Sequence, residues 1–330
     1  MSVSRVLSGL TIRRFILLSC LFLFATQTAC TWSPPRREWD STSLPRVRVL
    51  KKKIVMTAFV VKSPVQVQDI DDIAQGIPHE MLSRLEYSGS FLVRQSKNLL
   101  SYERVQAEPS TELVKQVARE NDAQFVIAGE VRSAGVRSDK KYFGLWETRH
   151  RQIEIEFAIY DGYSGAFLSR HHLMRATDNE GAIGRDKVFG SVAFYATDFG
   201  RAIDSLLQES VAWIRTDLAS FPMMARIIQV NGNEFSIDAG LGANLIVGDT
   251  GLLIQEADQL PLTGLSAQQS KPLQYGLAQS NLGVFKIIQV QYPFAIGQKQ
   301  EQQAANNETA TSAPGFEIKV GDLVRFDAKN

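Results

Sequence analysis

Four histidines are the side chains of this sequence best suited to metal binding or to proton transfer near neutral pH. His171 and His172 are adjacent in a segment with the composition of a strand. Because neighbouring residues of a strand point to opposite faces, this pair is not expected to hold one ion. His79 stands beside Glu80, and His150 is alone in a charged loop. The histidines therefore predict neither a metal centre nor a general base.

Two other motifs resemble ligand-binding sequences but lack required residues. Asp69, Asp71 and Asp72 precede a predicted helix without the glycine and terminal glutamate of a calcium loop, so we interpret them as negative charges that favour a helix N-terminus. The Gly-Leu-Gly segment 240–242 has no third glycine at dinucleotide spacing, and it follows a hairpin. With no nucleophile elbow either, we expect no enzyme activity, no catalytic residue, no cofactor and no metal.

The strongest chemical signal is Cys30. Arg13 and Arg14 precede an apolar run over 15–25, and Thr28 and Ala29 come directly before the cysteine. A basic start, a short apolar run and small residues are typical of a secretory signal peptide, which we place at 1–29. The run is too short to span a bilayer. Cys30 is the predicted lipidation site of a bacterial lipoprotein, and the alternative is a plain signal peptide cut nearby, for example after Gln27.

The second residue after Cys30 is Trp32, which does not supply the aspartate that commonly retains lipoproteins at the inner membrane. If Cys30 is acylated, we therefore expect association with the outer membrane. Cys20 lies inside the apolar run and is interpreted as an ordinary residue of the signal peptide.

The composition is that of an ordinary globular protein. The 330 residues are 44% hydrophobic and 22% charged, which predicts two folded domains with real cores. A mature chain starting near Cys30 keeps at most one cysteine, so we expect no internal disulfide. The net charge of +1 gives no electrostatic support for binding nucleic acid, and nothing indicates a small-molecule substrate.

A basic, proline-containing tether is predicted over 30–53, with a solvated linker or a contact to anionic headgroups or cell-wall polymer as its two alternative roles. It contains three prolines and seven basic residues: Arg36, Arg37, Arg46, Arg48, Lys51, Lys52 and Lys53.

The segment 54–220 predicts an α/β domain in which helices cover a sheet. We expect strands at 54–61, 91–95, 124–131, 152–160 and 166–174, the last two forming a hairpin, and helices at 77–88, 111–121 and 198–217. Ser110 and Gly89 are expected to cap helices, and Pro78 should lie near the first helical turn. Trp213 is interpreted as a core residue.

The segment 221–330 predicts a small all-β domain. Asn231-Gly232 favours a type I′ turn between strands 225–230 and 233–238, and further strands are expected at 251–255, 283–291 and 322–327. Val-Gly-Asp occurs at 247–249 and again at 320–322, each time ahead of an apolar strand. The polar run 297–315 is expected to be a mobile loop, and 258–279 is a second irregular region.

The chain resembles the flagellar assembly protein T (FlgT) family. The segment 188–203, V-F-G-S-V-A-F-Y-A-T-D-F-G-R-A-I, is similar to the end of that family's middle domain, and 210–214 continues the likeness. The segment 54–85 is similar to the opening of the same domain, and the C-terminal hairpin with its Val-Gly-Asp segments resembles the family's SH3-like last domain. The resemblance covers about 50–330.

The resemblance implies a TolB N-terminal-like α/β middle domain followed by an SH3-like domain. It also implies a non-enzymatic periplasmic factor of bacterial motility that helps build the H ring of the flagellar basal body. Its partners would be basal-body ring proteins and further copies of itself, at the outer membrane. The best-known members carry another N-terminal domain, for which 30–53 leaves no room, and a lipid anchor is not standard among them.

Two alternatives use the same TolB-like domain. One is an outer-membrane lipoprotein that binds and activates a peptidoglycan synthase, a role that suits a tether after Cys30. The other is a curli-type secretion pore subunit, which needs membrane-spanning strands of about 9 to 11 residues. Only 152–160 and its partner approach that length.

Overall fold

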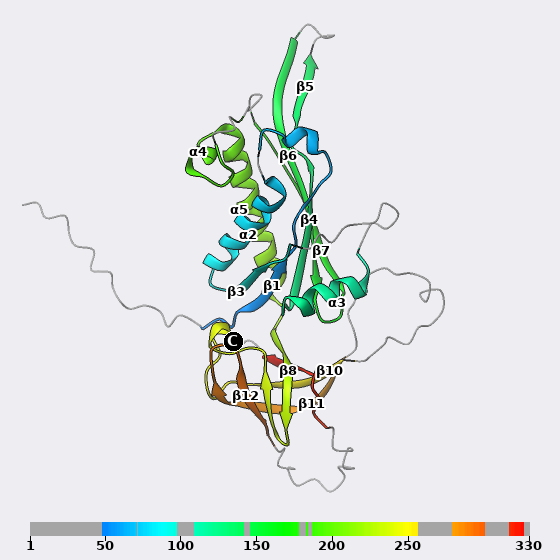
Figure 1. Ribbon diagram of the computed structural model, residues 1–330, viewed down its shortest axis with the longest axis vertical. Helices are drawn as coiled ribbons and strands as arrows, with labels where there is room; N and C mark the ends of the chain where they lie inside the picture. The colour runs from blue at the N-terminus through cyan, green and yellow to red at the C-terminus, as the bar shows by residue number, and fades with distance from the viewer. Residues whose placement is uncertain are drawn as a thin grey trace, which may run out of the picture. The chain divides into compact units, whose positions relative to one another are not determined.

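The computed structural model describes residues 48–70, 72–97, 109–141, 146–177, 183, 187–256, 279–300 and 317–326. The described residues all belong to one compact unit, which begins at Arg48. It contains a mixed sheet covered by helices and a closed barrel of strands (Figure 1). The coarse prediction of a mixed α/β fold followed by an all-β part is therefore confirmed.

The sheet has the strand order β3-β1-β4-β6-β5, with β2 beside β4 and β7 beside β6. The pairs β1–β3 and β1–β4 are parallel, whereas β6 runs antiparallel to β4, β5 and β7. The strands are β1 (Lys52–Met56), β2 (Val60–Val61), β3 (Phe91–Gln95), β4 (Phe125–Ser133), β5 (Val136–Lys141), β6 (Trp146–Asp161) and β7 (Phe167–Ala176).

Helices pack on both faces of the sheet because its central strands are apolar on both sides (Figure 1). Ile54, Ile127 and Phe157 lie in the large core with α2 (Ile73–Tyr87) and α5 (Asp198–Ala219). Val126 and Ala158 face the opposite way, toward α3 (Thr111–Glu120). Two short helices, η1 (Pro64–Val67) and α4 (Val192–Tyr195), complete the described helical elements of this part.

The ends of the helices follow the capping signals. The side chains of Ser110 and Thr197 accept hydrogen bonds from backbone N–H groups of the first turns of α3 and α5. Gly89 follows α2 with a φ of 73°, as expected for a C-terminal cap. No helix among the described residues is long and apolar enough to cross a membrane.

Three local predictions for the α/β part were wrong: the bounds of the first strand, the end of the tether and the place of Pro78 in its helix. The strand expected at 54–61 begins at Lys52 and is interrupted, so 52 and 53 belong to the fold rather than to the tether. Helix α2 begins at Ile73, which places Pro78 inside it. Proline cannot donate to the carbonyl four residues earlier, and that Ala74 oxygen instead accepts the Phe59 N–H at 3.0 Å.

The barrel closes in the order β10-β11-β12-β9-β8-β13. Its strands are β8 (Met223–Asn231), β9 (Glu234–Ile237), β10 (Thr250–Glu256), β11 (Gln279–Val290), β12 (Ala295–Lys299) and β13 (Leu323–Phe326), with a short helix η3 (Leu241–Ala243) after β9. Phe235 and Phe285 meet edge to face in its core, with ring centroids 5.5 Å apart.

Two predictions for the barrel were also wrong. Strand β12 was missed and takes up 297–299 of the expected mobile loop, while 301–315 lies outside the described residues. In the β8–β9 hairpin, Asn231 pairs with Glu234, and Gly232 has a φ of 62° whereas Asn233 is not among the residues with positive φ. Glycine at the first loop position, without a positive φ at the second, is the pattern of a type II′ turn.

Candidate functional site: the junction of sheet and barrel

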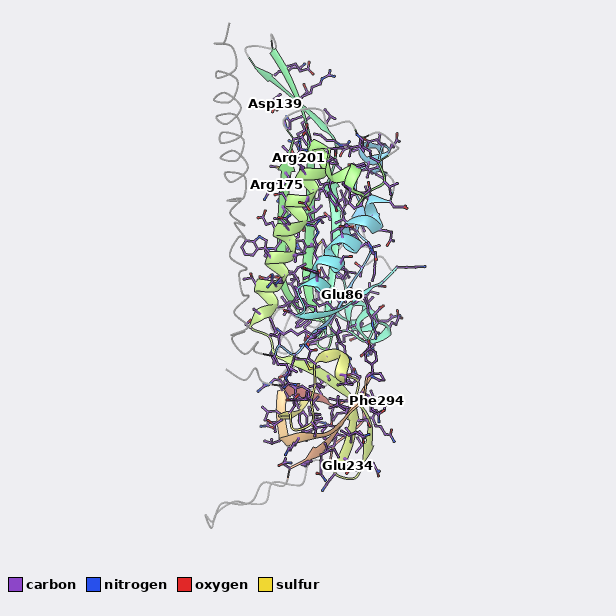
Figure 2. The ribbon with its side chains drawn as sticks, turned by 90° about the vertical axis from the view of Figure 1, so that its left-hand side faces the viewer. Glu86, Asp139, Arg175, Arg201, Glu234 and Phe294 are labelled. Atoms are coloured by element: carbon purple, nitrogen blue, oxygen red, sulfur yellow. The ribbon has the colours of Figure 1, made fainter. Side chains whose placement is uncertain are left out.

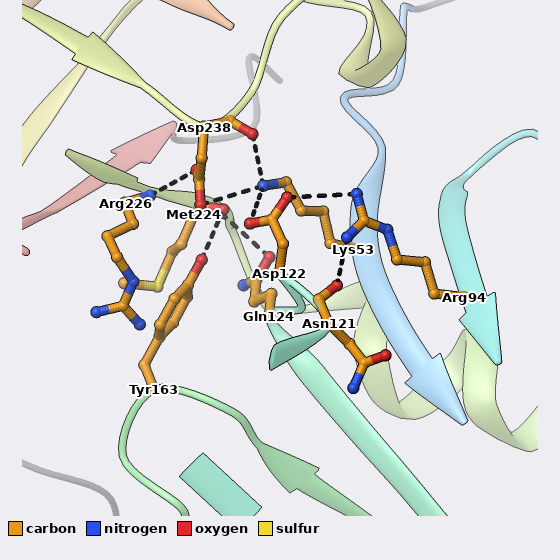
Figure 3. Close-up of polar contacts among 9 residues, drawn as sticks. All are labelled: Lys53, Arg94, Asn121, Asp122, Gln124, Tyr163, Met224, Arg226 and Asp238. Atoms are coloured by element: carbon orange, nitrogen blue, oxygen red, sulfur yellow. Dashed lines mark hydrogen bonds and ion pairs between the residues drawn. The ribbon is translucent and has the colours of Figure 1, made fainter. Parts of the chain in front are cut away.

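Lys53 lies at the centre of a polar cluster that joins the sheet to the barrel (Figure 3). Its ammonium group is 2.8 Å from Asp122 Oδ1 and 3.2 Å from Asp238 Oδ2, and it donates to the Asp238 backbone oxygen at 2.6 Å. Asp122 follows α3 and Asp238 follows β9. Since the lysine side chain is only 8% exposed, the ion pairs link the two parts away from bulk water.

Burial raises the pKa of the Asp238 carboxyl to about 6, and a hydrogen bond with Asp122 acts in the same direction, while Lys53 opposes both. The Arg226 backbone N–H also donates to Asp238 Oδ1 at 2.8 Å. The cluster thus contains two carboxylates around one buried ammonium, and one of these carboxylates takes up a proton in mildly acidic solution. Arg94 lies at its rim, 3.6 Å from Asp122.

Gln124 fixes the connection between α5 and β8. Its side-chain amide donates to the Pro222 oxygen at 2.8 Å and accepts from the Met224 N–H at 3.2 Å. Its own backbone N–H donates to the Lys53 oxygen at 3.0 Å. The residue directly ahead of β4 therefore holds the entry into the barrel by its side chain and is itself held to β1 by its backbone N–H.

Tyr163 adds a buried anchor from the β6–β7 turn. Its hydroxyl donates to the Met224 oxygen at 3.3 Å, and the Arg226 guanidinium lies 5.2 Å from the centre of its ring. Burial raises the pKa of the Tyr163 hydroxyl well above its ordinary value, so this hydroxyl remains a donor. Tyr163 and Met224 also pack with Ile254 and Leu323, which makes the junction partly apolar.

Basic residues predicted as part of the tether make specific contacts here. The Arg48 guanidinium donates to both carboxylate oxygens of Asp249, to Oδ2 at 2.8 Å. The Lys52 ammonium donates to the Leu218 carbonyl at the end of α5, where a positive charge is favoured. The predicted tether boundary at 53 is therefore too late, since Arg48, Lys52 and Lys53 hold folded elements together.

A second polar cluster lies on the same face of the sheet as α3, farther along β4 and β6. Glu130, Glu154 and Glu156 lie on β4 and β6, and Arg132 contacts Glu130 at 3.0 Å and Glu156 at 3.3 Å. His172 contacts Glu154 at 2.6 Å. Glu130 and Glu156 are opposite each other across the strands, and the half-exposed side chains of Arg132 and His172 supply the positive charge beside these carboxylates.

The adjacent histidines do point to opposite faces, as predicted. His171 contacts Asp217 of α5 at 2.6 Å, away from His172. Trp213 stacks on the His171 ring with centroids 4.9 Å apart, but its side chain is 42% exposed, so the prediction of a core residue was wrong. It lies on the outer edge of the α5 stripe, where the imidazole covers only one side of the indole.

The other candidate residues stay apart from one another. His79 is exposed, and His150 lies 3.5 Å from Asp139 on the ribbon formed by β5 and the start of β6 (Figure 2). Within the described part of the chain, no group of three His, Cys, Asp or Glu side chains could hold a metal ion. In the segment 240–242, Gly240 is the N-cap of η3 and the other two residues lie in that short helix. Cys30 lies outside the described residues.

The expected role of Asp69 as a helix N-terminal charge was wrong. Asp69 receives two hydrogen bonds from Arg151, at 2.6 and 2.8 Å, because that buried guanidinium needs a counter-charge. Asp72 does occupy the N-cap position of α2, but its side chain makes no capping hydrogen bond. Asp71 is outside the described residues.

The structure defines a class of protein in which an α/β layer is fixed to a six-stranded barrel through buried polar contacts. Residues 46–178 match the family model of the flagellar assembly protein T, middle domain. This segment is thus similar to the middle domain of that family, and the resemblance inferred from the sequence is confirmed for it. The matched range contains β1 to β7, and it ends before α5 and the barrel.

Several solved structures share a distant likeness. The hypothetical protein CT253 from Chlamydia trachomatis is 16% identical, with a TM-score of 0.40 over 52% of this chain and 99% of that one. The PelC dodecamer from Paraburkholderia phytofirmans is 14% identical, with a TM-score of 0.29 over 50% of this chain and 91% of that one. The lipoprotein GNA1162 from Neisseria meningitidis is 9% identical, with a TM-score of 0.26 over 51% of this chain and 98% of that one. Likenesses this weak carry no argument about function. No curated protein matches the sequence.

Proposed function

We propose that this protein is a non-enzymatic assembly factor of the flagellar basal body, which acts in the periplasm as part of an H-ring-type structure at the outer membrane. The observation that carries the proposal is the match of 46–178 to the middle domain of flagellar assembly protein T. We further propose that the sheet domain is TolB N-terminal-like, that the barrel is the SH3-like domain of that family, and that the partners are basal-body ring proteins and further copies of this chain.

The junction supports a structural role. Its lysine, carboxylates and glutamine amide hold protein groups on both sides, so these polar side chains are used in joining the sheet to the barrel. An assembly factor of this kind would act through its surfaces, with the two parts held as one body.

The test is deletion of the gene, followed by swimming assays and electron microscopy of isolated basal bodies. We expect reduced motility and thinner or missing ring density around the outer-membrane bushing, both restored by the wild-type gene. Normal basal bodies in the deletion strain would contradict the proposal. A change in cell shape or in sensitivity to cell-wall antibiotics, with motility intact, would instead favour the synthase activator.

We also propose that Cys30 is acylated and that 1–29 is its signal peptide. Cys30→Ser should move the protein from the washed membrane fraction to the soluble periplasmic fraction and abolish labelling by a palmitate analogue. Cys20→Ser, within the apolar run, is the matched control and should leave both readouts unchanged. Membrane association and labelling that persist in Cys30→Ser would rule out this anchor.

A further inference from the structure

Two turns of the barrel have the same structure and the same sequence. The first is 247–249 and the second is 320–322, both Val-Gly-Asp. Their glycines have φ values of 96° and 102°. In each turn an aspartate oxygen Oδ2 accepts the backbone N–H three residues earlier, at 2.9 Å in the first turn and 2.8 Å in the second.

Each turn also holds an equivalent strand. In the first, the Gly248 backbone N–H donates to the Ile287 backbone oxygen at 2.8 Å, and the Ile287 N–H donates to the Asp249 backbone oxygen at 2.7 Å. In the second, the Gly321 backbone N–H donates to the Ile227 backbone oxygen at 2.9 Å, and the Ile227 N–H donates to the Asp322 backbone oxygen at 2.8 Å.

The strands held by the turns repeat the sequence Ile-Ile-Gln-Val, at 227–230 on β8 and 287–290 on β11. Both have a register shift at this point. The barrel order β10-β11-β12-β9-β8-β13 reads the same from either end when β10 is exchanged with β13, β11 with β8 and β12 with β9. The barrel therefore has an internal twofold pseudosymmetry that relates the two turns.

The first turn binds an extended segment of the chain itself, 48–51. The Arg48 guanidinium makes bidentate hydrogen bonds to the Asp249 carboxylate and also donates to the Asn244 backbone oxygen at 2.6 Å. Asn244 donates to the Val49 oxygen at 2.9 Å, and Leu50 packs against the barrel core. An arginine followed two residues later by an aliphatic side chain is thus what the first turn recognises.

The second turn offers the same carboxylate. Among the described residues, no lysine or arginine side chain pairs with Asp322, whose side chain accepts the Lys319 N–H. Val320 beside it is 66% exposed and Ile228 is 47% exposed, and their counterparts at the first turn, Val247 and Ile288, are 61% and 37% exposed. The apolar surroundings are therefore alike, and a cation is present only at the first turn.

We infer that the second turn, 320–322, is a docking site for an extended segment of another polypeptide that carries an arginine. The guanidinium would pair with the free edge of the Asp322 carboxylate as Arg48 pairs with Asp249. At the first turn Leu50 packs against the barrel core while Val247 and Ile288 stay exposed, so the contact carried over to the second turn is the pairing of guanidinium and carboxylate.

The probe is the peptide Arg-Val-Leu-Lys, the sequence of 48–51, acetylated and labelled at its C-terminus with a fluorophore. Fluorescence anisotropy is measured against the full-length protein. We expect saturable binding that Asp322→Asn weakens at least about fivefold, since a lost charged contact of about 1 kcal/mol corresponds to that ratio. Asparagine keeps an oxygen acceptor for Lys319, so the turn and the thermal melting temperature should be retained.

Glu234→Gln removes an exposed carboxylate of β9, in the same barrel, and is the control, with binding expected to be unchanged. A peptide with glutamine in place of its arginine should lose binding as Asp322→Asn does. Three results would each overturn the inference: no binding to the wild-type protein, equal binding to Asp322→Asn, or a self-association that Asp322→Asn abolishes while the peptide does not compete with it.

Discussion

Lys53 is the residue on which the junction depends most, because it is the buried cation between Asp122 and Asp238. Removing one partner of a buried ion pair leaves an uncompensated charge and costs about 3 to 5 kcal/mol. We therefore expect Lys53→Met to lower the free energy of unfolding by about that amount in urea titrations.

The matched control for this prediction is Lys62→Met. Lys62 contacts Glu130 at 3.0 Å, but its side chain is 47% exposed, so the expected loss is below about 1 kcal/mol. Equal losses for the two variants would show that the Lys53 ion pairs contribute no more than a surface contact.

Asp238 gives the junction a pH dependence with a definite sign. Its pKa of about 6 in the folded protein lies above the ordinary 3.8, mainly through burial. Between about pH 4 and 6 the folded chain keeps a proton that the unfolded chain has released, so the stability contributed by this group falls as the pH rises. Asp238→Asn should remove about 1 to 3 kcal/mol of this fall.

Unfolding free energies measured from pH 4 to 7 would test this prediction for Asp238. Glu86→Gln, at an exposed carboxylate of α2, is the control and should follow the wild-type curve (Figure 2). A wild-type curve and an Asp238→Asn curve that stay parallel would contradict it.

At the scale of elements, α5 is the longest helix described, and its start is fixed by one side chain. Thr197 accepts the Gly200 N–H at 2.9 Å, which satisfies a backbone donor that has no partner within the helix. Thr197→Ala should therefore cost about 1 kcal/mol of stability. Thermal denaturation followed by circular dichroism measures this loss.

Thr216 provides the comparison within the same helix. Its hydroxyl donates to the Ala212 oxygen at 2.9 Å on an exposed face, and alanine is the better helix former. Thr216→Ala should be neutral or slightly stabilising. A loss equal to that of Thr197→Ala would mean that the effect comes from threonine removal in general.

Local signals predicted most elements well, because caps and alternating burial act over only a few residues. Ser110 and the alternation of Ile153, Ile155 and Phe157 are examples. Pro78 was misplaced because the group that compensates for its missing hydrogen bond, the Phe59 N–H, comes from a distant loop. Strand β12 was missed because its alternation is short and runs directly into a polar segment.

The junction could not be predicted in the same way. Lys53 is separated from Asp122 by 69 residues and from Asp238 by 185. The only local signals were a lysine directly ahead of an apolar strand and aspartates at the ends of predicted elements. Which of them meet is decided by how the sheet and barrel pack, and a single sequence contains no spacing that reports this. The repeated Val-Gly-Asp turns were visible, but their hydrogen-bonding equivalence was not.

At the scale of the whole molecule, side-chain hydrogen bonds and ion pairs at the junction connect the sheet to the barrel. Gln124 holds Pro222 and Met224, and Tyr163 holds the carbonyl of Met224. A ring subunit that transmits load between neighbours would need such a connection, since a loose one would let the two parts rotate. The proposed assembly role therefore depends on the junction as much as on any outer surface.

The double variant Gln124→Ala with Tyr163→Phe tests this coupling, because it leaves three backbone groups of 222–224 without side-chain partners, at about 1 to 3 kcal/mol each when buried. The barrel strands contain no tryptophan, so tryptophan fluorescence reports the rest of the chain while circular dichroism also reports the barrel. We expect coincident unfolding curves for the wild type and separated ones for the variant, with faster amide exchange in β8 than in α5.

Gln116→Ala with Tyr87→Phe alters exposed side chains of the same types and should keep the curves together. Coincident curves in the junction variant would show that the apolar cluster around Met224 suffices to hold the two parts together.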